Sequence, residues 1–287
     1  MIPTGPHGGD GARLAAALGV DPGAVLDLSA SLNPGAPDAG EVVAKHLDAI
    51  GRYPDPKAAT AALAEAMGVD RSRLLLTNGG AEAIALVAAE LGGSVEEPDF
   101  ALYPRGSGPR WRSNPHNPTG RLAPPDERAE VWDEAFFPLA TGRWTSGHPL
   151  VVGSLTKLLA CPGLRIGYVV NDDVDRLRER QPAWSVNGLA VAALPDLLER
   201  VDLPGWSAAV ATLRAQLVDV LRAAGLSPEP SDAHFLLVRA PGLRDRLAPL
   251  GVLVRDCASF GLPEHVRVAV PDERGLARLE EALCAAG

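Results

Sequence analysis

Short apolar segments recur along the chain, and each leads into polar or turn-forming residues; they are Leu74–Leu76, Val131–Trp132, Leu150–Val152 and Ile166–Val170. Their length is typical of buried strands. Lys57–Met67 is instead rich in Ala, Leu and Glu and is followed by Gly68, which favours a helix with a glycine stop. Strands that alternate with helices predict an α/β fold with a mostly parallel central sheet, covered on both faces.

The C-terminal third has a different pattern. A long helix is expected around Trp206–Ala224 and a last helix over about residues 273–285. Short strands are expected between them, at Phe235–Val238, Val252–Val254 and Val266–Val268. This pattern favours a small α+β domain. We therefore expect an N-terminal arm over residues 1–34, a large domain over 35–199 and a small C-terminal domain over 200–287.

Composition narrows the class of protein. The formal net charge of −9 argues against a surface for nucleic acid or anionic membranes, which needs clustered positive charge. No stretch approaches the roughly 20 apolar residues of a membrane span, and the first ten residues lack the apolar core of a signal peptide. The three cysteines are too few and too dispersed for a disulfide framework or a zinc site. We expect a cytoplasmic protein with no metal centre.

The segment Ser154–Lys157 carries the strongest chemical signal. It follows the expected strand Leu150–Val152 and precedes Gly163–Arg165, so that two hydroxyls and two cations fall within a dozen residues. A phosphorylated aldehyde cofactor needs this set, because an amine binds the aldehyde covalently while hydroxyl and guanidinium groups bind the phosphate. Taken alone, the segment could equally be a surface loop with a solvated lysine.

Three further segments support that chemistry. Asn78–Glu82 follows a strand and starts a helix, so that its Gly-rich turn offers free N–H groups to a phosphate, although such a turn is common. Ser113–Gly120 is an unusual string in which prolines on both sides stiffen the backbone around Asn117. Val131–Ala135 places Asp133 at the end of a strand, where its carboxylate can keep a pyridine nitrogen protonated.

Together these segments resemble the class I/II aminotransferase superfamily, which has the fold-type I architecture and uses pyridoxal 5'-phosphate (PLP), and within it the histidinol-phosphate aminotransferase branch. The resemblance runs from about His7 to Val270 and implies that Lys157 holds the cofactor. It implies that Asp133 pairs with the pyridine nitrogen and that Asn117 bonds the ring hydroxyl. The implied phosphate contacts are Gly79, Gly80, Ser154 and Arg165.

The resemblance also implies ring, partner and substrate contacts. Phe100 matches the aromatic residue that stacks on the cofactor ring, with a core aromatic as the alternative. Tyr53 matches a tyrosine that reaches the neighbouring subunit's phosphate, which implies a homodimer with shared active sites. Arg267 matches the arginine that clamps the substrate carboxylate, a task that suits a bidentate guanidinium. Further candidates for substrate binding are His7, Asn33, Asn187 and Arg255, although Arg255 could also be a surface residue.

Within the branch, three features are similar to the threonine-phosphate decarboxylases of cobalamin biosynthesis. They are the N-terminal strings His7–Asp10 and Asp27–Pro34, the string Gln181–Asn187, and Phe136 where the aminotransferases usually have tyrosine. The function expected first is PLP-dependent decarboxylation of L-threonine O-3-phosphate to aminopropanol phosphate. One alternative is an aminotransferase acting on histidinol phosphate or another phosphorylated amino acid, and a second is a PLP-binding protein without catalysis.

The chain departs from the family pattern in one region. Only ten residues separate Tyr103 from Asn114, and fifteen separate Asn117 from Asp133. The family normally has an additional strand and helix here, so we expect a shortened sheet, with residues 106–112 as a polar, Gly-rich bypass loop. A sheet that has lost a strand exposes a new edge, which dimerisation or a loop would have to cover. This shortening is what motivates the non-catalytic alternative.

Overall fold

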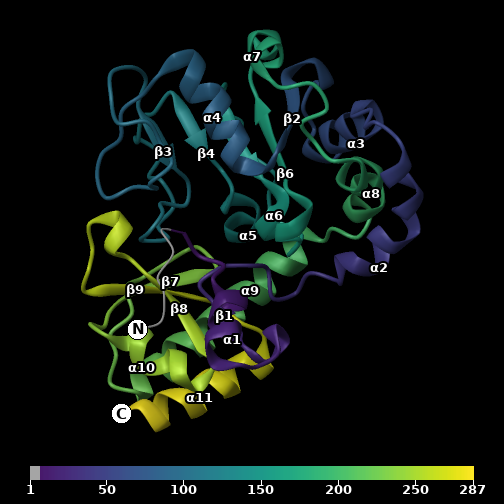
Figure 1. Cartoon of the computed structure of the whole chain (residues 1–287). Coiled ribbons are helices and arrows are strands. Elements are labelled where there is room, and N and C mark those ends of the chain that lie inside the picture. Colours follow the sequence, from purple (N-terminus) through teal and green to yellow (C-terminus); the bar gives the residue numbers. More distant parts are fainter. Residues whose placement is uncertain (1–6) are drawn as a thin grey trace.

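The computed structural model describes residues 7–287, which form two bodies stacked on one another (Figure 1). One body is built on a five-stranded sheet and the other on a four-stranded sheet. None of the described helices combines the length and the apolarity that crossing a bilayer requires.

The five-stranded sheet has the order β2-β6-β5-β4-β3, with β2 at Leu74–Asn78, β6 at Ile166–Val170, β5 at Val151–Ser154, β4 at Val131–Asp133 and β3 at Trp111–Ser113. The pairs β3·β4 and β4·β5 are parallel, whereas β6 is antiparallel to both of its neighbours. Four strands therefore run in one direction and only β6 in the other. This confirms the α/β fold with a mostly parallel sheet.

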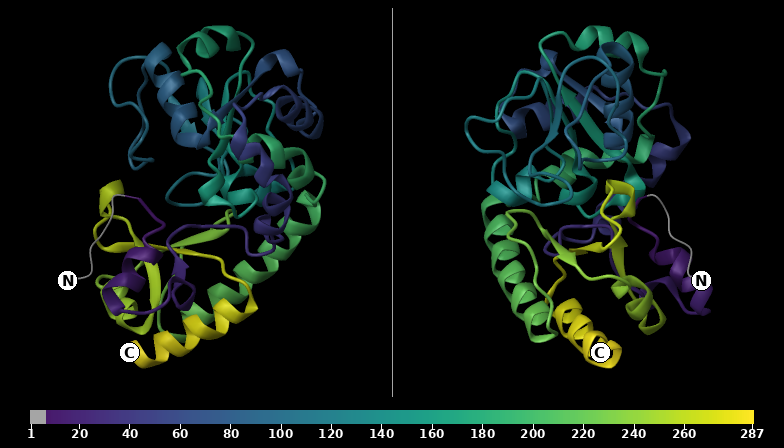
Figure 2. Two further views of the ribbon diagram at one scale, coloured as in Figure 1. Left: turned by 45° about the vertical axis from the view of Figure 1, so that its right-hand side comes forward. Right: turned by 90° about the vertical axis from the view of Figure 1, so that its left-hand side faces the viewer.

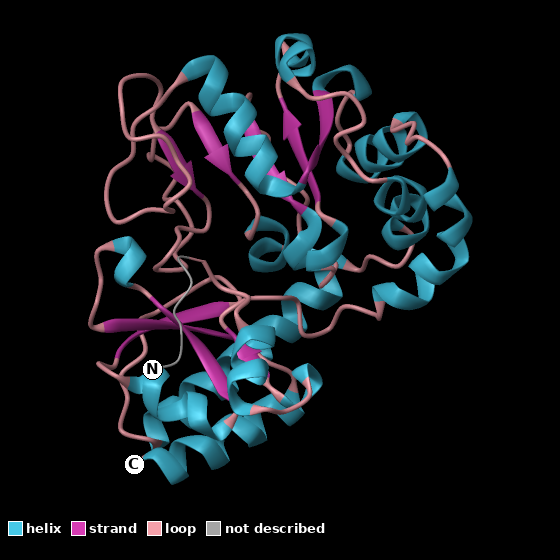
Figure 3. Cartoon of the chain, viewed as in Figure 1, coloured by secondary structure: helices cyan, strands magenta, loops and turns pink. Residues whose placement is uncertain are grey.

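Helices cover both faces of this sheet, and the alternation of side chains along each strand explains how (Figure 3). Leu75, Val152 and Val169 pack on one face with α4 (Gly79–Leu91) and α7 (Val174–Arg180). Their neighbours Leu74, Val151 and Tyr168 pack on the other face with α3 (Lys57–Met67) and α8 (Gly188–Leu198). Because both faces are buried, the strands are apolar throughout, which is the signal visible in the sequence.

The second sheet has the order β1-β8-β9-β7, with β1 at Leu26–Leu28, β8 at Val252–Asp256, β9 at His265–Ala269 and β7 at Phe235–Arg239. β1 is parallel to β8, and the other pairs are antiparallel. The long helix α9 (Leu203–Ala223) and the last helix α11 (Glu273–Ala286) share one apolar core with this sheet. Figure 2 shows both helices side by side along the lower body. The expected small α+β domain is present.

The long helix α9 connects the two bodies. Leu203 and Val210 of α9 lie in the core of the larger body, while Leu217 and Leu221 lie in that of the smaller one. From the expected N-terminal arm, α1 (Gly11–Leu18) and β1 pack on the smaller body, α1 through Leu14. The shorter helices are α2 (Ala39–Val43), α5 (Phe137–Thr141), α6 (Leu155–Leu158) and α10 (Leu243–Leu247), with 3-10 turns at Pro22–Ala24, Ala44–Gly51, Arg71–Arg73, Pro162–Leu164, Ala248–Leu250 and Ala258–Phe260.

The shortened region corrects one expectation. Residues 106–109 are irregular, but Trp111 and Arg112, which were expected in the bypass loop, belong to strand β3. They form a strand because the side chains of Trp111 and Ser113 are buried and the backbone pairs with β4. The outer edge of β3 is covered by the chain itself: Ser94 bridges Arg110, and the Trp111 indole N–H donates to the Gly92 carbonyl at 3.1 Å.

Candidate active site

A cavity of about 380 Å³ lies where the two bodies meet. Its wall combines the end of β4 and the short helix α6 (Leu155–Leu158) with β8, β9 and the N-terminal segment around His7. Eight of the residues singled out from the sequence line it, namely His7, Phe100, Asn117, Asp133, Lys157, Arg165, Arg255 and Arg267. Residues more than 250 positions apart in the sequence thus meet at one site. Among the described residues, no group of His, Cys, Asp and Glu side chains could hold a metal ion.

Lys157 is presented by the short helix α6, directly after β5. Leu155 and Leu158 are buried in the core of the larger body, which leaves Lys157 in the cavity wall. Ser154 caps this helix by accepting from the Thr156 backbone N–H at 3.3 Å. Burial lowers the pKa of Lys157 to about 8, Asp133 opposes this change, and Arg267 adds to it. The amine is therefore neutral, and nucleophilic, in a substantial fraction of molecules near neutral pH.

Asp133 ends strand β4 and directs a buried carboxyl group into the cavity. Its Oδ1 accepts from the Ala135 N–H at 2.8 Å and its Oδ2 from the Tyr103 hydroxyl at 2.7 Å. Burial raises the pKa of Asp133, whereas these hydrogen bonds and the charge of Lys157 act in the opposite direction. An oriented carboxylate of this kind can accept a hydrogen bond from a protonated ring nitrogen.

A cradle for a phosphate lies next to Lys157. Gly79 begins the 13-residue helix α4 at φ +74°, and a Cβ there would lie 2.4 Å from Nη2 of Arg165. A Cβ at Gly80 would lie 3.2 Å from Cβ of Ser154. The Thr156 Oγ1 is buried and has no hydrogen-bond partner among the described residues. A guanidinium, an unused hydroxyl and a helix N-terminus suit a phosphate ester, so the residues present fit a phosphorylated aldehyde.

Two arginines stand side by side on the opposite wall. Arg255 of β8 and Arg267 of β9 are register partners, and both side chains are buried. Arg267 donates from Nη1 to the Asn117 Oδ1 at 2.5 Å and lies 4.5 Å from the Phe235 ring centroid. Burial, together with the charge of Arg255, lowers the pKa of Arg267 to about 9. Two adjacent guanidinium groups suit a ligand with two anionic groups.

The remaining predicted residues of the wall come from irregular segments. Phe100 is half-buried, with the His7 ring centroid 5.9 Å from its own. The segment around His7 is held by the Gly9 N–H, which donates to Ser29 Oγ at 2.8 Å, and by the Gly11 N–H, which donates to Asp27 Oδ2 at 2.9 Å. Burial and the charge of Arg255 lower the pKa of His7.

Six predicted residues do not line the cavity: Gly79, Gly80 and Ser154 belong to the cradle described above, and Tyr53, Asn187 and Asn33 lie elsewhere. Tyr53 is 79% exposed, and its ring lies 4.6 Å from that of Trp184. The Asn187 side chain caps α8 and donates to the Leu164 carbonyl at 2.7 Å. The buried Asn33 donates from Nδ2 to the Leu158 carbonyl at 3.0 Å and from its backbone N–H to the Lys157 carbonyl at 2.9 Å. Asn33 thus supports the turn that carries Lys157.

Several residues of the wall have no predicted site role, among them Ser29, Tyr103 and Ser113, while Thr156 was noted only as one of two hydroxyls and Phe136 only as a feature shared with the decarboxylases. Thr156 precedes Lys157 directly and Tyr103 follows Phe100 by three positions, so proximity to the chosen residues was the available signal. Nothing in the sequence pairs Tyr103 with Asp133, because that hydrogen bond joins segments 30 positions apart.

A buried amine, an oriented carboxylate and a set of phosphate-binding donors around one cavity suit the covalent binding of a phosphorylated aldehyde. A family model described as aminotransferase class I and II matches residues 111–283. Threonine-phosphate decarboxylase of Salmonella typhimurium is 32% identical, with 96% of both chains covered. Histidinol-phosphate aminotransferase 1 of Dechloromonas aromatica is 30% identical, with 94% of this chain and 92% of that protein covered. The chain therefore belongs to the class I and II aminotransferase family, whose enzymes depend on PLP.

A solved structure agrees with this assignment. Histidinol-phosphate aminotransferase from Sinorhizobium meliloti, in complex with PLP, superposes with a TM-score of 0.83 at 17% identity, covering 99% of this chain and 94% of that one. At 17% identity, this superposition shows that the two chains share a fold and no more. The alignment with the Salmonella protein extends over 352 positions, whereas this chain has 287 residues, so the relative carries segments that are missing here. The chain is a shortened fold-type I enzyme that uses PLP.

Proposed function

We propose that this enzyme decarboxylates L-threonine O-3-phosphate to aminopropanol phosphate, a step in cobalamin biosynthesis that we expect to take place in the cytoplasm. The observation that carries the proposal is the pair Arg255 and Arg267, both buried in the cavity wall that also holds Lys157. This substrate has a carboxylate and a phosphate, and two neighbouring guanidinium groups can bind both.

In this proposal each residue has a separate task. Lys157 would hold the cofactor, and its amine would act as base and acid at Cα of the substrate. PLP supplies an electron sink for the electron pair left at Cα. Asp133 would hold the proton on the ring nitrogen, and Arg267 would hold the substrate carboxylate in the orientation in which the Cα–carboxylate bond is the one that breaks. Carbon dioxide leaves, and a proton takes its place at Cα.

The same site supports a second candidate, transfer of the amino group from histidinol phosphate or another phosphorylated amino compound. Relatives with this activity are nearly as similar to the chain as the decarboxylase is. Phe136 favours decarboxylation: it lines the cavity where the aminotransferases usually have tyrosine, and it offers no hydroxyl there.

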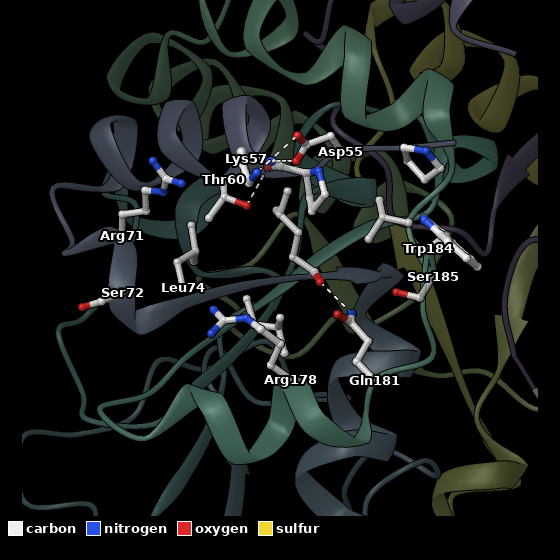
Figure 4. Close-up of a pocket in the computed structure, with 15 residues that line it drawn as sticks. Asp55, Lys57, Thr60, Arg71, Ser72, Leu74, Arg178, Gln181, Trp184 and Ser185 are labelled. Atoms are coloured by element: carbon white, nitrogen blue, oxygen red, sulfur yellow. Dashed lines mark hydrogen bonds and ion pairs between the residues drawn. The ribbon is translucent and has the colours of Figure 1, made fainter. Parts of the chain in front are cut away.

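We also propose a homodimer in which Tyr53 reaches the partner's site. Tyr53 and Trp184 are largely exposed, and their rings lie against each other at a tilt of 32°. Trp184 borders a second cavity of about 720 Å³ along the edge strand β2, where Gln181 donates to the Leu76 carbonyl at 2.8 Å (Figure 4). Sedimentation velocity should show a dimer for the wild type and weaker association for Trp184→Ser, with exposed Leu250→Ser on the opposite body as the control. A monomeric wild type would contradict the proposal.

The proposed reaction is tested by mass spectrometry of the products formed by the PLP-loaded protein from L-threonine O-3-phosphate, with and without 2-oxoglutarate. Aminopropanol phosphate in both tubes is the expected result, because decarboxylation needs no amino acceptor. A keto acid that forms only in the presence of 2-oxoglutarate would instead establish the aminotransferase.

A further inference from the structure

Tyr103 lies behind Asp133, in the irregular segment that precedes β3. Its side chain is 3% exposed, and its hydroxyl donates to Asp133 Oδ2 at 2.7 Å. Two aromatic contacts fix the ring: Trp111 stacks on it with centroids 5.5 Å apart, and Phe100 meets it edge-on at 5.6 Å. The hydroxyl thus approaches the carboxylate from a position that the surrounding rings determine.

We propose that Tyr103 is a positioning residue that fixes the orientation and the negative charge of Asp133 toward the cofactor's ring nitrogen. The inference rests on the proposed role of Asp133 and extends the site by one residue. It concerns how strongly this chain binds and polarises PLP, whichever substrate the enzyme takes.

The hydrogen-bond geometry supports this role. Each oxygen of Asp133 accepts from one protein donor, Oδ1 from the Ala135 N–H and Oδ2 from Tyr103. Each oxygen keeps a further lone pair for a ligand. With a donor on both sides the carboxylate has one preferred rotation, whereas loss of Tyr103 would leave it tethered through Oδ1 alone.

Electrostatics leads to the same conclusion. Burial raises the pKa of Asp133, and the hydrogen bond from Tyr103 is one of the interactions that oppose this. Burial raises the pKa of Tyr103 well above its usual value, and the charge of Asp133 raises it further, so that the phenol stays protonated and remains a donor at every working pH. Without this donor, Asp133 is more often neutral and holds the protonated ring nitrogen less well.

The shortened region explains why Tyr103 matters in this chain. Trp111 belongs to β3, and its indole N–H is held by the Gly92 carbonyl, so the stacking partner of Tyr103 is part of the sheet edge. The covered edge therefore also holds the tyrosine against Asp133. A loop that only bypassed the missing segment would leave Tyr103 without this support.

The test is a double-mutant cycle of Tyr103→Phe and Asp133→Asn, measured on purified holoenzymes. Phenylalanine keeps the ring contacts and removes only the hydroxyl. We expect Tyr103→Phe to raise the Kd for PLP by about tenfold, to alter the absorbance spectrum of the bound cofactor, and to lower kcat with little change in KM. In the Asp133→Asn background the same change should have almost no further effect on the PLP Kd, because the two residues act through one hydrogen bond.

The control is Tyr168→Phe, which removes a hydroxyl from another buried tyrosine of the same body, one that makes no hydrogen bond to Asp133. It should leave the PLP Kd and the spectrum unchanged. A Tyr103→Phe protein with wild-type PLP affinity and spectrum would overturn the proposal, and so would effects that add fully to those of Asp133→Asn. The PLP Kd and the absorbance spectrum are both measured without a substrate, so these two results are independent of whether decarboxylation is the reaction.

Discussion

Lys157 is the residue that we propose to bind PLP covalently, and burial together with neighbouring arginines lowers the pKa of its amine. Its pKa is lowered to about 8, so the reactive amine becomes more abundant as the pH rises and is the major form only above that value. We predict that the rate of covalent PLP binding by the apoprotein rises with pH and levels off above about pH 8. Stopped-flow absorbance checks this, and borohydride reduction followed by peptide mass spectrometry should find the cofactor on Lys157. Lys157→Arg should show no covalent attachment, and attachment at another lysine would refute the assignment.

Asp99 gives a second prediction at the residue scale. Its Oδ1 accepts from the Phe100 N–H at 2.8 Å and from Ser113 Oγ at 2.9 Å, while Oδ2 is buried with no partner among the described residues. Burial raises the pKa of Asp99 to about 7. Between about pH 4 and pH 7 the native state keeps a proton that the unfolded chain releases, so this group makes the free energy of unfolding fall as the pH rises.

Asp99→Asn should remove this dependence, because an amide resembles the protonated carboxyl group. At pH 8 we predict that the variant is more stable than the wild type by on the order of 2 kcal/mol, and that the difference disappears near pH 4. Urea unfolding at several pH values measures it, with the exposed Asp219→Asn as the control. A variant that is less stable at pH 8 would show that Asp99 is charged and paired in the native state.

At the scale of elements, the edge of β3 depends on glycines in the preceding loop. Gly93 has φ +152°, and a Cβ there would lie 2.0 Å from Nε1 of Trp111, the group that donates to the Gly92 carbonyl. We predict that Gly93→Ala destabilises the fold by roughly 1–3 kcal/mol, because it adds backbone strain and displaces the indole. Gly106→Ala in the same loop should be nearly neutral, since a Cβ there meets only the Gly93 carbonyl oxygen at 4.0 Å. Thermal unfolding compares the two, and equal midpoints would contradict this view of the edge.

The sequence predicted the elements whose signals are local. Lys57–Met67 and Ile166–Val170 match the observed bounds because a glycine stop and a continuous apolar run mark them. Strand β3 was missed because only Trp111 and Ser113 are buried in a polar string, and pairing with β4 decides its conformation. Asn33 and Asn187 were placed with the substrate for a similar reason: the carbonyls that accept from their amides come close only in the folded chain.

At the scale of the whole molecule, the shortened region borders the site through Tyr103 and Asn117, whereas Lys157, Arg255 and Arg267 come from other parts of the chain. Residues 92–110 cover the edge of the large sheet beyond β3. Lys157 lies on α6 directly after β5, Asp133 ends β4, and Arg255 and Arg267 come from the smaller body. The cavity between the bodies thus keeps the residues that we propose for holding the cofactor and the substrate. We therefore expect an active enzyme.

The measurement that tests this most directly uses L-threonine O-3-phosphate labelled with ¹³C in its carboxyl group, incubated with the PLP-loaded protein and no keto acid. We predict that the wild type releases labelled carbon dioxide and aminopropanol phosphate in equal amounts. The Lys157→Arg variant should form neither product. Bound PLP with no labelled carbon dioxide, or transfer of the amino group with the label retained, would contradict it.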